Sequence, residues 1–120
     1  MSTLSLILVA LVGLLHAYIC WFEMFRWEER GPKVFKSFPI ELFKPTRALA
    51  ANQGLYNGFL AAGLFWSLLI SDPAWAANVA LFFLACVVVA GLYCAATVAV
   101  LILFVQSLPA AIAILSILFF

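Results

Sequence analysis

The stretch RWEERGPKVFKSFPIELFKPTR, residues 26–47, is the main guide to the topology, because it separates two long apolar runs and contains every lysine and arginine of the chain. The flanking runs, 4–25 and 48–70, are each long enough to cross a bilayer as a helix, which needs about 20 residues. Two further apolar runs, 75–96 and 100–120, follow. We therefore predict an all-α integral membrane protein, a four-helix bundle that forms a single transmembrane domain over residues 1–120.

The composition agrees with this prediction. Hydrophobic residues make up 68% of the chain and charged residues only 9%, whereas ordinary soluble domains are about half apolar and a quarter charged. Membrane lipid is therefore the first partner that we expect. The net charge of +1 provides no basic field of the kind that nucleic-acid binding needs, so we expect no nucleic-acid partner.

The basic residues also predict the orientation. Loops rich in lysine and arginine stay in the cytoplasm, so the 26–47 loop is expected there. An even number of spans then places both termini on the outer side, together with the turn at Ser71-Asp72-Pro73. Asp72 and Pro73 are suited to begin the third span as its cap and first residue. The third and fourth spans meet near residues 97–99, where almost no polar residue marks a break between them. One long bent helix is therefore the alternative there.

Two interpretations of the basic loop compete. Its aromatic and aliphatic residues are interleaved with lysines and broken by two prolines. Such a segment can lie along the lipid headgroups as an anchor, with its aromatic rings at the apolar boundary and its lysines on anionic lipid. Alternatively, it can form a lid over a site.

The first span carries two ionisable residues, His16 and Glu23. They are seven residues apart, which puts them on one helix face about 10 Å from each other. Ionisable residues within a span are functional candidates, and we predict that this pair handles protons as catalytic residues. The alternatives are structural: an ion pair of Glu23 with Arg26, and an inter-helix hydrogen bond of His16 that fixes packing.

Polar residues in the other spans gather at the same depth. Counted from the cytoplasmic ends at about 1.5 Å per residue, they all fall in the cytoplasmic half of the membrane with the ionisable pair. These predicted ligand-binding residues are Asn52, Gln53, Tyr56, Asn57, Tyr93 and Gln106. A cavity open to the cytoplasm would explain this distribution, and a helix-packing network is the alternative.

The same residues carry a resemblance to a known family. A first-helix His and Glu followed by Trp, then NQGLYNG at 52–58, AGLY at 90–93 and QSLPA at 106–110, resemble the small four-helix bacterial membrane proteins grouped as domain of unknown function 1304. The resemblance covers essentially the whole chain and implies a multi-pass bacterial membrane protein. We therefore expect it in the inner membrane, where the outer side, on which the basic loop places both termini, is the periplasm. The family has no established activity. The chain departs from it between the third and fourth helices, where the usual basic residue is missing.

Three functions fit these residues. The first is binding, or acid-base isomerisation, of a small lipophilic molecule, with the amides and tyrosines orienting it. The second is proton-coupled transport by a dimer, since four helices enclose little volume. The third is a structural or assembly role in a larger membrane complex. One His and one Glu fall short of a metal-ligand set, so we predict no metal site. The sequence identifies no cofactor, and it leaves open whether the protein is an enzyme.

Overall fold

The computed structural model describes residues 1–120 and contains helices but no strands. The prediction of an all-α chain is therefore confirmed. In chain order the elements are α1 (Thr3–Phe25), α2 (Trp27–Val34), the 3-10 turn η1 (Ile40–Leu42), α3 (Arg47–Leu69), α4 (Pro73–Thr97), the π-helical turn η2 (Leu103–Ser107) and α5 (Leu108–Phe119).

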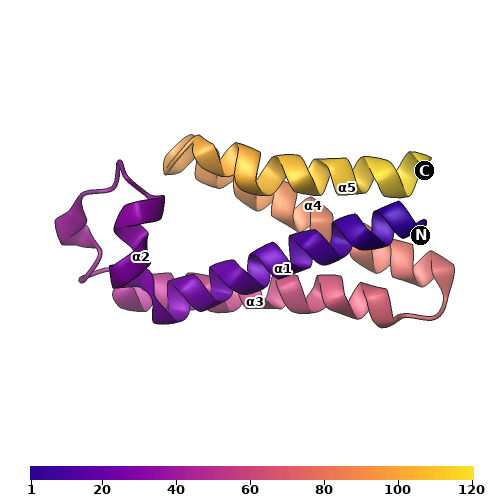
Figure 1. Cartoon of the computed structure of the whole chain (residues 1–120), viewed down its shortest axis with the longest axis horizontal. Coiled ribbons are helices and arrows are strands. Elements are labelled where there is room, and N and C mark those ends of the chain that lie inside the picture. The colour runs from indigo at the N-terminus through magenta and orange to yellow at the C-terminus, as the bar shows by residue number, and fades with distance from the viewer.

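The long helices run roughly along one axis of a molecule that measures 48 × 23 × 18 Å (Figure 1). Both termini and the turn between α3 and α4 lie at one end. The short helix α2 and the rest of the basic loop lie at the opposite end. The chain thus separates its basic loop from its termini by the full length of the helices.

Local sequence signals explain where two of the helices begin. The carboxylate of Asp72 accepts a hydrogen bond from the backbone N–H of Trp75 at 2.9 Å, and Pro73 is the first residue of α4. This confirms the predicted cap, which satisfies one of the N–H groups left free at a helix start. The hydroxyl of Ser2 caps α1 in the same way through the N–H of Ser5.

The chain reverses direction between α4 and α5 (Figure 1). The amides of Val98 and Ala99 both donate to the carbonyl of Cys94, which ends α4 at Thr97. Helical structure resumes at Leu101, one residue later than the sequence predicts, and continues through η2 into α5. The two runs are therefore separate helices, and the alternative of one long bent helix is wrong.

Helix α1 packs most extensively against α3, and glycines make this approach close. A Cβ atom at Gly54 would lie 2.9 Å from the Cβ of Glu23 and 3.0 Å from the backbone oxygen of Cys20. A Cβ atom at Gly58 would meet only the Cys20 side chain, at 3.0 Å. Small residues four apart let two helix backbones approach, as expected for this pair.

Most buried residues are small or polar, a few large apolar residues join them, and most other large apolar residues are exposed. The buried core joins α1, α3, α4 and α5 through residues such as Val9, Leu64, Leu84 and Ala110. On the outside of α1, a stripe of large apolar residues at helical spacing is exposed: Leu4, Ile7, Leu11, Leu14, Tyr18, Trp21 and Phe25. A water-soluble bundle would bury such a stripe.

Candidate functional site

A cavity of about 590 Å³ lies among α1, α3, α4 and η2, at the end of the molecule that carries the basic loop. Fifteen of its twenty lining residues are hydrophobic, and the rest are Glu23, Gln53, Asn57, Thr97 and Gln106. Six of the eight residues that the sequence singled out line this one space: Glu23, Gln53, Tyr56, Asn57, Tyr93 and Gln106.

Helical periodicity explains how α1 and α3 present their lining residues. Helix α1 contributes positions 15, 18, 19, 22 and 23, and α3 contributes 53, 56, 57 and 60. Both sets follow the i, i+3, i+4, i+7 spacing of one helix face. Tyr18 and Phe22 also line the cavity and were not predicted from the sequence. They lie four residues apart on α1, and the helical spacing counted back from Glu23 reaches Ile19 but neither of them.

The carboxylate of Glu23 is buried, with 3% of the residue exposed. Its Oε1 accepts a hydrogen bond from the amide nitrogen of Asn57 at 2.7 Å, and its Oε2 accepts one from the amide nitrogen of Gln53 at 3.1 Å. The ion pair with Arg26 that the sequence allowed does not form, because Arg26 pairs with Glu29 instead. The carboxylate is therefore held by amides of α3, without a cation.

His16 is fully buried, and both of its ring nitrogens are hydrogen-bonded. Nδ1 lies 2.9 Å from the carbonyl oxygen of Val12, and Nε2 lies 3.0 Å from the amide nitrogen of Gln106. A carbonyl oxygen only accepts and an amide NH₂ only donates, so Nδ1 carries the hydrogen and the ring is neutral. His16 thus joins α1 to η2 and orients Gln106, whereas its own side chain does not line the cavity.

The remaining predicted residues differ in position. Tyr56 and Tyr93 line the cavity and are 63% and 73% exposed, so they stand at its mouth. Asn52 is exposed, donates to the carbonyl of Ala48 one turn back on its own helix, and does not line the cavity. The structure gives His16 and Glu23 separate partners and no hydrogen bond to each other.

The basic loop closes one side of the cavity. Val34 and Phe35, at the end of α2, belong to its lining. Phe35 also packs on Trp27 with ring centroids 5.8 Å apart, and Phe43 packs on the same indole at 5.0 Å. The aromatic rings of the loop therefore face one another, and this arrangement favours the lid over the anchor.

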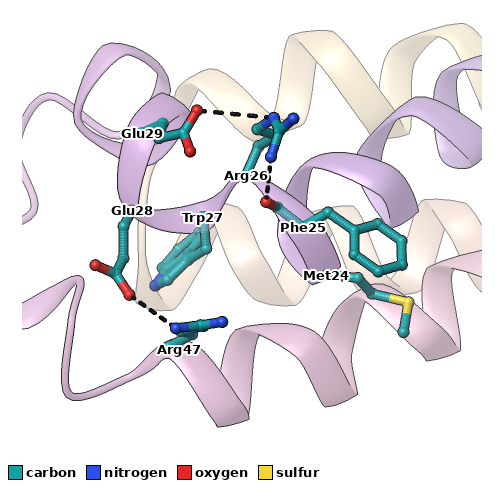
Figure 2. Close-up of a pocket in the computed structure, with 7 residues that line it drawn as sticks. All are labelled: Met24, Phe25, Arg26, Trp27, Glu28, Glu29 and Arg47. Atoms are coloured by element: carbon teal, nitrogen blue, oxygen red, sulfur yellow. Dashed lines mark hydrogen bonds and ion pairs between the residues drawn. The ribbon is translucent and has the colours of Figure 1, made fainter.

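A second, smaller cavity of about 320 Å³ lies where α1 meets α2 (Figure 2). Its charged groups are already paired with each other: Arg26 with Glu29 at 3.7 Å, and Arg47 with Glu28 at 3.7 Å. These side chains are largely exposed, so the pairs are weak. We therefore regard this cavity as a surface feature of the loop and place the candidate site at the larger one.

Comparison with known proteins identifies the family. The model of the family described as protein of unknown function (DUF1304) matches residues 10–118. No curated protein and no solved structure matches the chain. The match spans α1 through α5 and includes all the motifs on which the resemblance rested. The chain belongs to the DUF1304 family.

Proposed function

We propose that this chain is a multi-pass protein of the bacterial inner membrane that binds a small lipophilic molecule in the cavity beside Glu23. By length and composition, α1 and α4 could each cross a membrane, and the second half of the chain adds the shorter apolar helix Leu103–Phe119. The outward-facing apolar stripe and the many small residues of the interior support the membrane part of the proposal, since lipid solvates apolar side chains and small residues let helices pack.

The topology that we propose keeps the basic loop in the cytoplasm and both termini in the periplasm. This topology requires the basic loop and the termini to lie at opposite ends of the molecule. Helix α2 with the basic loop lies at one end and the termini lie at the other (Figure 1). In this arrangement the chain is a four-helix bundle of α1, α3, α4 and α5, and the cavity lies in its cytoplasmic half.

One observation carries the ligand proposal: a single apolar cavity ends on a buried carboxylate and three amides. Its volume falls within the range of small-molecule pockets, about 300–1,000 Å³, and pockets of this kind combine a hydrophobic lining with a few polar groups. Binding is favoured over acid-base isomerisation because His16 has both nitrogens engaged and does not face the cavity. Glu23 alone would have to move the proton.

The test is to identify what co-purifies with the protein in mild detergent by native mass spectrometry. Ala90 lines the cavity, and Ala85 is exposed on the same helix outside it. We expect a specific lipophilic molecule to accompany the unmutated chain and Ala85→Phe, and to be lost from Ala90→Phe, whose ring fills the space. Equal amounts of the same molecules on all three proteins would refute the ligand proposal.

A further inference from the structure

The carboxyl group of Glu23 lies in an apolar cavity and has no counter-ion from the protein. It is the only acidic or basic side chain in the lining. The two ion pairs of the chain lie elsewhere, at Arg26–Glu29 and Arg47–Glu28. A charge removed from water needs a partner, and in membrane proteins such residues pair or mark a binding path. A charged Glu23 would therefore need a partner from outside the chain.

The side-chain amide nitrogens around this carboxylate each bond to an acceptor of the protein. The amide nitrogen of Asn57 donates both to Glu23 and to the backbone oxygen of Gln53 at 3.1 Å, and that of Gln106 donates to His16. The side-chain oxygens of Gln53, Asn57 and Gln106 accept no hydrogen bond from the protein. The polar end of the cavity thus offers free acceptor oxygens to a ligand group that donates.

Aromatic rings complete the lining. Tyr18, Phe22, Phe35, Tyr56 and Tyr93 all border the cavity. The faces of such rings carry partial negative charge and attract ammonium groups, with most effect where water is excluded. The carboxylate, the acceptor oxygens and the aromatic ring faces of this lining all favour a positively charged group.

We propose that the ligand is a lipophilic amine whose protonated ammonium head binds the carboxylate of Glu23 while its apolar body fills the rest of the cavity. This inference rests on the proposed function and narrows it to one chemical class. The amides of α3 hold the carboxylate in place, and the ammonium N–H groups bond to it and to the free amide oxygens. A neutral alcohol would satisfy the acceptors but would leave the charge unpaired.

The experiment compares two probes with the same chain and different heads, dodecylamine and dodecan-1-ol, at pH 7 on the full-length protein in non-ionic detergent. Isothermal titration calorimetry gives both dissociation constants. We expect dodecylamine to bind at least about tenfold more tightly than dodecanol, a difference of about 1.4 kcal/mol. Glu23→Gln should abolish that preference, and Glu29→Gln, the same change at an exposed position, should keep it.

The outcomes separate the two proposals. Equal binding of both probes to the unmutated chain would overturn the ammonium assignment and leave the lipophilic cavity standing. Failure of both probes to bind would overturn both. The comparison of the two probes on the unmutated chain needs no variant. It therefore tests the ammonium assignment even if Glu23→Gln fails to fold. In that case Glu23→Asp, which retains the charge, is expected to retain the preference for the amine.

Discussion

Replacing Gly54 by alanine tests whether the close contact of α1 with α3 holds the site together. The added Cβ would lie 2.9 Å from the Cβ of Glu23, 2.9 Å from the Cγ of Met24 and 3.0 Å from the backbone oxygen of Cys20. None of these atoms is the free end of a flexible side chain, so the helices must separate. Gly58 is the matched control, because a Cβ there meets only the Cys20 side chain.

The expected loss of stability is the difference in the free energy of unfolding between Gly54→Ala and Gly58→Ala. Both gain up to about 1 kcal/mol of helix propensity on changing glycine to alanine, and this gain cancels in the comparison. Overpacking a well-packed contact costs about 1–3 kcal/mol. We therefore expect Gly54→Ala to have a free energy of unfolding about 1–3 kcal/mol below that of Gly58→Ala, measured by denaturant titration with circular dichroism in detergent micelles.

The same separation should weaken ligand binding, because it pulls the amides of α3 away from the carboxylate on α1. Dodecylamine affinity, measured as above, is expected to fall in Gly54→Ala and to stay near that of the unmutated chain in Gly58→Ala. If the two variants are equally stable, or Gly58→Ala is the less stable one, the inferred packing of α1 on α3 is wrong.

Three further predictions follow from single contacts and from the proposed topology. Asn57→Ala removes a 2.7 Å hydrogen bond to the buried carboxylate and should lower the free energy of unfolding by about 1–2 kcal/mol. Asn52→Ala, at an exposed side chain, should change the free energy of unfolding by less than about 0.5 kcal/mol. Equal effects of the two substitutions would contradict the roles assigned to Asn57 and Asn52. Gln106→Leu leaves Nε2 of His16 without its partner and should lower the free energy of unfolding by about 1–2 kcal/mol in the same denaturant titration. An unchanged denaturation midpoint would show that the bond between His16 and Gln106 does not stabilise the fold. In intact cells, a membrane-impermeant maleimide should label Ser71→Cys above the background of the unmutated chain and leave Ser37→Cys unlabelled, and the reverse pattern would invert the proposed orientation.

Much of the fold could be predicted from the order of residues, because the deciding signals are local. Long apolar runs predict helices, and Asp72 followed by Pro73 marks where α4 begins. The spaced motifs from His16 to Gln106 identified the family that the comparison confirmed. All of these features are read along the chain and do not depend on how the helices pack.

The contacts of the site were decided only by the tertiary structure. The sequence named Glu23 but offered Arg26 as its partner, whereas the packing of α1 on α3 supplied amides about thirty residues away. It named Asn52 with Gln53, and the rotation of about 100° per residue turned one side chain away from the cavity and the other into it. The bond between His16 and Gln106 joins residues 90 positions apart. Such contacts depend on how helices cross and on which face each presents, and no local pattern fixes either.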